Sequence, residues 1–146
     1  GEKVVTALVH ALSKYGQDSW FQTAILSSDD GSSPELLKLL VAQDTFFGSA
    51  DPWKTTFLES ISTIFGSRNQ NDQVMFLLGV LSGVEMEKDT KWREAVVRGL
   101  TEGIKKSGTS TPQMKEVVTK IKADSTLTVD ETIKQLSQLY AGSPQP

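Results

Sequence analysis

Apolar residues recur at spacings of three and four along almost the whole chain, and no segment shows the alternation of a half-buried strand. This period is that of the α-helix, in which side chains three and four residues apart share a face. Glycines, prolines and short polar runs interrupt the pattern, as helix ends and turns do. The pattern predicts eight helices, over residues 2–15, 19–28, 35–43, 52–65, 73–84, 90–107, 112–124 and 130–141.

Several helix boundaries can be predicted from single residues. Gly16 is expected to end the first helix in the left-handed conformation, and Gly66 to end the fourth. Pro34 and Pro112 suit the first turn of a helix, where the missing N–H costs nothing. The apolar stripe that should turn the first helix toward the core consists of Val4, Val5, Leu8, Leu12 and Tyr15.

Three helix starts share a heading in which an aspartate precedes a tryptophan by two or three residues. These headings are Asp18 with Trp20, Asp51 with Trp53, and Asp89 with Trp92. The tryptophans lie 33 and 39 residues apart, within the range of helical repeats. We expect the aspartates to cap their helices and the tryptophans to pack in the core or between repeats. A row of ligand-stacking tryptophans is the alternative.

The repeated heading predicts an all-α fold, a right-handed α-solenoid of about four antiparallel helix pairs of the HEAT or ARM kind. Residues 1–108 would form three HEAT-like pairs, and residues 109–142 a terminal pair of the sort that caps a stack. Residues 143–146 are predicted to be a disordered tail. The alternative is an irregular α-helical bundle, in which three tryptophans stand at helix starts by chance.

Gly99 and Gly103 lie four residues apart on one face of a predicted helix. Each glycine costs about 1 kcal/mol against alanine inside a helix, so two of them require a reason. We expect them to permit close packing of a neighbouring helix. A membrane dimer motif is excluded because Glu102, Lys105 and Lys106 belong to the same helix.

The chain offers little conventional chemistry. It has no cysteine and a single histidine, His10, so thiolate sites and the usual histidine metal or catalytic sites are not expected. Asp29 and Asp30 lack the spacing of a calcium loop and fit a turn between helices. We therefore predict no catalytic, cofactor-binding or metal-binding residues, and no enzyme activity. An enzyme with an unrecognised site is the least favoured alternative.

The charge pattern favours neither nucleic acid nor a membrane as a partner. The net charge is −3, and no apolar run approaches the roughly 18–20 residues of a membrane span. Residues 1–73 carry 5 basic and 9 acidic side chains, and residues 74–146 carry 10 and 9. The lysines at positions 105, 106, 115, 120 and 122 form a modest basic area among carboxylates, which we interpret as a solvated surface.

Three segments resemble a known family. Residues 14–28 (KYGQDSWFQTAILSS) are similar to a recurring phrase in HEAT-like regions of planctomycete-type secreted proteins, which combine a membrane-bound-dehydrogenase-like propeller with a haem-binding cytochrome c domain. Residues 57–70 (FLESISTIFGSRNQ) and 91–108 (KWREAVVRGLTEGIKKSG) look like later helices of the same region. The resemblance covers roughly residues 4–108 and consists of structural phrases.

The resemblance implies a non-catalytic spacer or interaction module within a larger secreted redox protein, with a periplasmic or extracytoplasmic location. Its partners would be the neighbouring domains of the parent chain or another protein, and its own residues would hold no cofactor. A free-standing scaffold that binds proteins or peptides on the inner face of the solenoid is the second hypothesis.

Overall fold

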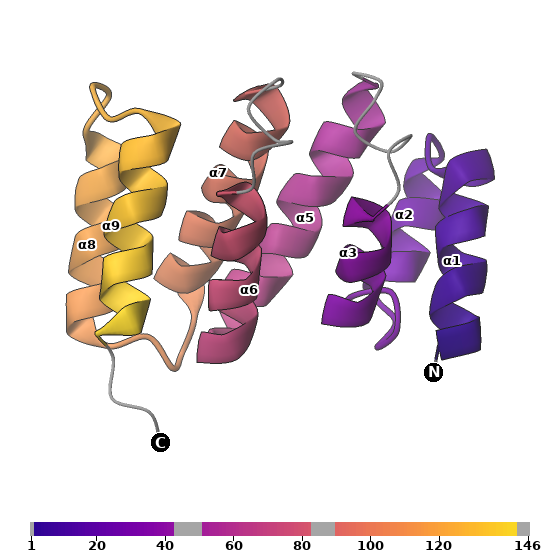
Figure 1. The fold of residues 1–146 in the computed structure, drawn as a ribbon, viewed down its shortest axis with the longest axis horizontal. Helices are drawn as coiled ribbons and strands as arrows, with labels where there is room; N and C mark the ends of the chain where they lie inside the picture. The colour runs from indigo at the N-terminus through magenta and orange to yellow at the C-terminus, as the bar shows by residue number, and fades with distance from the viewer. Residues whose placement is uncertain (1, 43–50, 83–89, 143–146) are drawn as a thin grey trace. The chain divides into compact units, whose positions relative to one another are not determined.

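The computed structural model describes residues 2–42, 51–82 and 90–142, and every regular element within them is an α-helix (Figure 1). The all-α prediction is therefore confirmed for this part of the chain. None of these helices combines the length and the apolar character needed to cross a membrane. The helices are α1 Glu2–Tyr15, α2 Ser19–Leu26, α3 Pro34–Val41, α5 Pro52–Arg68, α6 Asn71–Leu81, α7 Thr90–Lys106, α8 Pro112–Ala123 and α9 Val129–Ala141.

Side-chain caps fix several helix starts. The carboxylate of Asp18 accepts from the backbone N–H of Trp20 (2.9 Å) and of Phe21 (3.4 Å) at the start of α2. Ser33, Thr111 and Thr128 cap α3, α8 and α9 in the same way. Such a cap stabilises a helix by about 1 kcal/mol because it satisfies N–H groups that have no partner within the helix.

The helix end predicted at Gly66 is wrong, and the one at Gly16 is right in position but not in backbone conformation. No described glycine has a positive φ, so Gly16 does not end α1 in the left-handed conformation. Gly66 lies inside α5, which continues to Arg68 and ends at Asn69, a residue with φ 50°. The physical reason is packing, since both glycines lie against another helix or side chain, and the left-handed position falls to an asparagine, which tolerates it.

The chain divides into two compact units, residues 1–57 and 58–146, with the division inside α5. In the first unit α1 packs on α3. Val4 and Tyr15 are 48% and 60% exposed, so their place in the predicted core stripe is wrong. The buried stripe of α1 is centred on Val9. The core residues of these two helices are Val5, Val9, Leu12, Leu36, Leu37 and Leu40.

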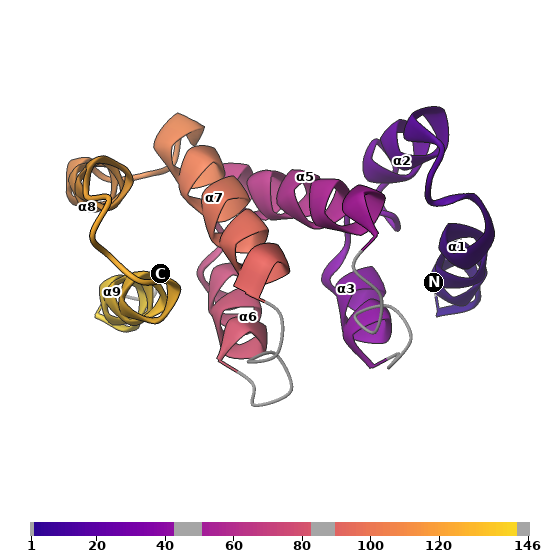
Figure 2. The same cartoon turned by 90° about the horizontal axis from the view of Figure 1, so that it is seen from above.

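The second unit is built around α7, which contacts both α8 and α9, while α9 also contacts α6. Figure 2 shows α8 beside α7 and α9 beside α6. In a regular stack the first helix of a pair packs on the first helix of the pair before it. Here α8, the first helix of the last pair, contacts the second helix of its predecessor. The last pair therefore departs from that order within residues 58–146.

Asn69 connects three parts of the second unit. The hydroxyl of Tyr140 in α9 donates to the Asn69 side-chain oxygen, and the Asn69 amide donates to Ser110 Oγ (3.2 Å). Ser110 in turn donates to the Ile104 carbonyl at the end of α7 (2.7 Å), and Asn71 donates to the Tyr140 carbonyl (3.0 Å). Tyr140 is 1% exposed, and burial raises the pKa of its hydroxyl. The phenol therefore stays a neutral hydrogen-bond donor.

We expect Asn69→Ala to lower the free energy of unfolding by about 2–4 kcal/mol. Alanine loses hydrogen bonds worth about 1 kcal/mol each, and the left-handed backbone costs it about 1–2 kcal/mol. Urea unfolding followed by circular dichroism measures the change. Asn69→Gly removes the same hydrogen bonds without the backbone strain, so its loss should be smaller, about 1–2 kcal/mol. Two variants that unfold at the wild-type urea concentration would contradict the role of Asn69.

Candidate functional site

The three predicted aspartate–tryptophan headings differ in their surroundings. Trp92 in α7 is 6% exposed and Trp53 in α5 is half-buried, whereas Trp20 in α2 is 84% exposed. The expected packing is therefore present for Trp92 and, in part, for Trp53, but it is wrong for Trp20. The first turn of α2 points this ring into solvent, and no described helix covers it.

The aspartates of the three headings also differ in the contacts that they make. Asp18 caps α2, as predicted. Asp51 directly precedes α5, where its carbonyl accepts from Lys54 N (3.1 Å) and its carboxylate pairs with the Lys54 ammonium (3.4 Å). Asp89 lies outside the described residues.

Two hydrogen bonds and one contact between aromatic rings fix the corner between α1 and α2. Asp18 N–H donates to the Tyr15 carbonyl (2.9 Å), and the buried Gln22 side chain donates to the Gly16 carbonyl (2.6 Å). The Tyr15 and Phe21 rings lie 5.8 Å apart at an interplanar angle of 38°. We call Tyr15, Trp20 and Phe21 the aromatic corner. It combines a fixed backbone with two exposed aromatic rings, and sequence reasoning missed it because exposure depends on which helices pack nearby.

A cleft of about 230 Å³ lies between the end of α1, α3 and the start of α5. Its inner surface includes the core residues Val9, Leu12 and Leu40, and Trp53 forms one wall. The Trp53 ring rests on Gly16, where an added Cβ would lie 2.3 Å from the nearest ring carbon. The glycine predicted to end α1 thus makes room for the heading tryptophan of α5.

Glycines bring the backbones of α5 and α7 into contact within the second unit. A Cβ on Gly99 would lie 2.2 Å from the Glu59 carbonyl oxygen, and one on Gly103 would lie 2.2 Å from that of Thr63. From the opposite side, a Cβ on Gly66 would lie 2.4 Å from the Leu100 carbonyl oxygen. The close approach predicted from Gly99 and Gly103 is present, and Gly66 is a third participant.

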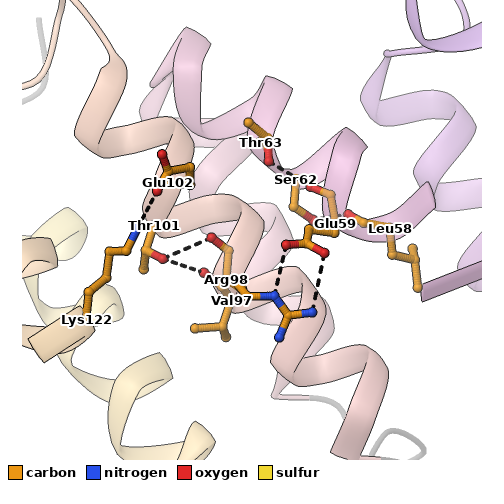
Figure 3. Close-up of polar contacts among 9 residues, drawn as sticks. All are labelled: Leu58, Glu59, Ser62, Thr63, Val97, Arg98, Thr101, Glu102 and Lys122. Carbon is orange, nitrogen blue, oxygen red and sulfur yellow. Dashed lines mark hydrogen bonds and ion pairs between the residues drawn. The ribbon is translucent and has the colours of Figure 1, made fainter. Parts of the chain in front are cut away.

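The polar side chains around this contact are bonded within their own helices or to each other (Figure 3). Ser62 Oγ donates to the Leu58 carbonyl (2.6 Å), and Thr101 Oγ1 donates to the Val97 carbonyl (2.9 Å). Across the helices, Arg98 binds Glu59 through two nitrogens, at 2.9 and 3.3 Å, and this hydrogen bonding raises the Arg98 pKa. The cluster therefore serves helix packing.

Glu102 joins α7 to α8. It binds Lys122 of α8 and Lys106 of its own helix (3.1 Å), and these hydrogen bonds, with Lys122 the larger effect, lower its pKa from 4.5 to about 2. Lys120 pairs with Glu116 (3.0 Å). Three of the five lysines in the modest basic area thus have a carboxylate partner, which agrees with a solvated surface.

One ion pair that involves a buried arginine was not predicted. Arg93 in α7 is 6% exposed, and its guanidinium contacts the exposed Asp130 carboxylate at the start of α9 (2.6 Å). The sequence pattern does not show that Arg93 faces inward, because this depends on how α7 packs against its neighbours. His10 is exposed on α1, and the described residues contain no group of three or more potential metal ligands.

Comparison of this chain with family models, curated proteins and solved structures finds no match. The resemblance to HEAT-like regions of planctomycete-type secreted proteins therefore stays a prediction. The candidate sites of the described chain are the aromatic corner and the cleft, both within residues 1–57.

We expect Gly99→Ala to lower the free energy of unfolding by about 1–3 kcal/mol, because its methyl group must push α5 and α7 apart. Gly79→Ala is the matched control, since Gly79 lies inside α6 with no atom within 4 Å of an added Cβ. This control should gain about 0.5–1 kcal/mol from helix propensity. Urea unfolding measures both, and a stabilising Gly99→Ala would refute the close contact.

The Glu102 ion pairs should make stability depend on acid pH. A carboxyl with a lower pKa in the folded state stabilises the fold above its unfolded pKa, and the contribution is lost as pH falls through the folded value. The difference in urea midpoint between wild type and Glu102→Gln should therefore be largest above about pH 5 and shrink steadily as pH falls toward 2. Glu116→Gln, which breaks a pair within α8, controls for loss of a surface charge. A difference that is independent of pH would contradict the ion pairs.

Proposed function

We propose that this chain is a non-catalytic helical-repeat interaction module and that its aromatic corner packs against a helical partner. The observation that carries the proposal is Trp20, which is 84% exposed although Trp92 is buried and Trp53 is half-buried. Burying a tryptophan removes about 150–250 Å² from water, which is worth several kcal/mol at about 25 cal/mol per Å². Exposed Trp and Tyr on a fixed backbone are typical of residues that dominate protein interfaces.

The chain itself indicates the kind of surface that such a tryptophan covers. Trp53 stands at the start of the second helix of its pair and rests on Gly16, at the end of the first helix of the preceding pair. Trp20 occupies the same position in its own pair. By this internal analogy, the partner surface is the end of a helix at which a small residue leaves room for an indole ring.

The predicted arrangement of the helices as an α-solenoid is part of the same proposal. A right-handed α-solenoid of HEAT or ARM type is supported by the headings and by the packing of α1 on α3, which follows the rule that first helices stack. The contacts of α8 with α7 and of α9 with α6 suit a terminal pair that closes the array. The proposal that this chain is part of a larger secreted redox protein depends on the sequence resemblance alone. The coding sequence on either side of this chain tests that proposal.

Replacement of Trp20 by a photo-crosslinking amino acid in cells of the source organism should identify the partner. The same replacement at the exposed Lys115 of α8 is the control. The purified partner should then bind Trp20→Ala at least about 30-fold more weakly than wild type, which corresponds to a hot spot of about 2 kcal/mol. Lys115→Ala should bind as wild type does.

A stability measurement separates this effect from misfolding. Trp20→Ala should change the free energy of unfolding by no more than about 0.5 kcal/mol, as other surface substitutions do, whereas Trp92→Ala should cost about 3–5 kcal/mol. Unchanged partner binding by both Trp20→Ala and Tyr15→Ala would reject the aromatic corner as the contact surface.

A further inference from the structure

We propose that the uncovered side of α1 binds an amphipathic helix that carries acidic residues along one edge. This side meets the aromatic corner at Tyr15, so the inference rests on the proposed function and specifies the chemistry of the helical partner. It combines three observations on α1, which are the spacing of its apolar residues, their exposure and the charge of the row beside them.

Two apolar rows run side by side along α1, each with its members at spacings of four, three and four residues. The first row is buried in the core that α1 shares with α3, and it consists of Val5, Val9, Leu12 and Gly16. The second, which we call the open row, consists of Val4, Leu8, Ala11 and Tyr15.

The open row is in contact with water. Val4 and Tyr15 are 48% and 60% exposed, and Leu8 and Ala11 are half-buried. A helix that packs on one side needs one apolar stripe, with polar residues opposite. With two such rows, α1 has the pattern of a helix that has a neighbour on each of two sides. Anchors at these spacings are also those through which one helix binds another protein's helix.

The helix α8 shows that this pattern is not general in the chain. Its buried residues include Val118 and Ile121. The row that corresponds to the open row of α1 consists of Gln113, Val117 and Lys120. Because this row has one apolar member, water can cover it at little cost, whereas the open row of α1 exposes apolar groups along its length. The open row also ends at Tyr15, so a helix that follows it reaches the aromatic corner with its end.

A basic row flanks the open row and selects the charge of the partner. It consists of Lys3, Ala7, His10 and Lys14, and all four are exposed. The row holds two lysines and no acidic residue, although the chain as a whole has a net charge of −3. Charged residues beside an apolar helix seam determine which helix binds, because unlike charges attract across the contact and like charges repel. The partner helix should therefore carry aspartates or glutamates on the edge that faces this row.

The same charges disfavour a second copy of this chain as the occupant. Two α1 helices packed antiparallel about a twofold axis present the same edge to each other. Lys3 of one copy would then lie toward Lys14 of the other, and the two basic rows would repel. A partner with an acidic edge avoids this repulsion.

The test uses the whole chain and two synthetic peptides of about 20 residues, long enough to form a helix on their own. Both peptides carry leucines at spacings of three and four, and they differ only in having glutamates or lysines beside the leucines. In fluorescence anisotropy at low salt, the glutamate peptide should bind at least about ten-fold more tightly, because two attractive contacts replace two repulsive ones. Equal affinities, or no saturable binding of the glutamate peptide, would overturn the proposal.

Charge reversal assigns the preference to the basic row. The double variant Lys3→Glu, Lys14→Glu should bind the lysine peptide more tightly than the glutamate peptide. The double variant Lys115→Glu, Lys134→Glu makes the same change of charge at exposed positions of α8 and α9 and should keep the wild-type preference. If the Lys3 and Lys14 variant folds, as circular dichroism would show, and still prefers the glutamate peptide, the assignment is wrong.

Two further variants separate the open row from the aromatic corner. Val4→Asp places a charge in the open row and should weaken binding of the glutamate peptide at least about five-fold. Trp20→Ala changes α2 alone and should leave this affinity within about two-fold. Unchanged binding by Val4→Asp would reject the open row, whatever Trp20→Ala does to the partner of the aromatic corner.

Sedimentation equilibrium of the chain without peptide tests the second-copy alternative. A monomer is expected from the repulsion between the basic rows. A dimer that Val4→Asp dissociates would assign the open row to a second copy of this chain and overturn the proposed partner.

Discussion

The second unit depends on the close contact between the backbones of α5 and α7. Gly66, Gly99 and Gly103 leave no side chain between the helices, so carbonyl oxygens of one helix lie where a Cβ of the other would be. The short separation between the two helix backbones sets the positions of nearby side chains. Arg98 reaches Glu59 with two hydrogen bonds, and Asn69, one turn beyond Gly66, meets the side chains of Ser110 and Tyr140. Larger residues at the glycine positions would move these partners apart.

Local features of the fold can be predicted from the sequence. The cap at Asp18, the helix starts at Pro34 and Pro112 and the helical character of the described elements follow from short-range chemistry. The close contact at Gly99 and Gly103 also follows, because two glycines four residues apart in a helix require a neighbour. These predictions succeed because they need only the residues within one or two turns.

Predictions that depend on neighbouring helices fail more often. Gly66 looks like a helix end but lies inside α5, where it makes room for α7, and no local signal distinguishes the two roles. Trp20 and Trp53 stand in nearly identical headings, yet only Trp53 packs against the end of another helix, at Gly16. The inward position of Arg93 likewise arises from long-range packing. The contacts of α8 with α7 and of α9 with α6 have the same origin. The aromatic corner and the cleft were missed for this reason.

The hydrogen bond between Tyr140 and Asn69 also has a consequence for how the chain reaches its folded state. The two residues are 71 positions apart, and they join the last described helix to the first turn of the second unit. Contacts this distant in sequence form late, because the intervening chain must be ordered first. During synthesis, the second unit cannot complete its core until Tyr140 has left the ribosome. Until then, the apolar faces of α6 and α7 that α9 covers remain open to chaperones or to mispairing with other chains.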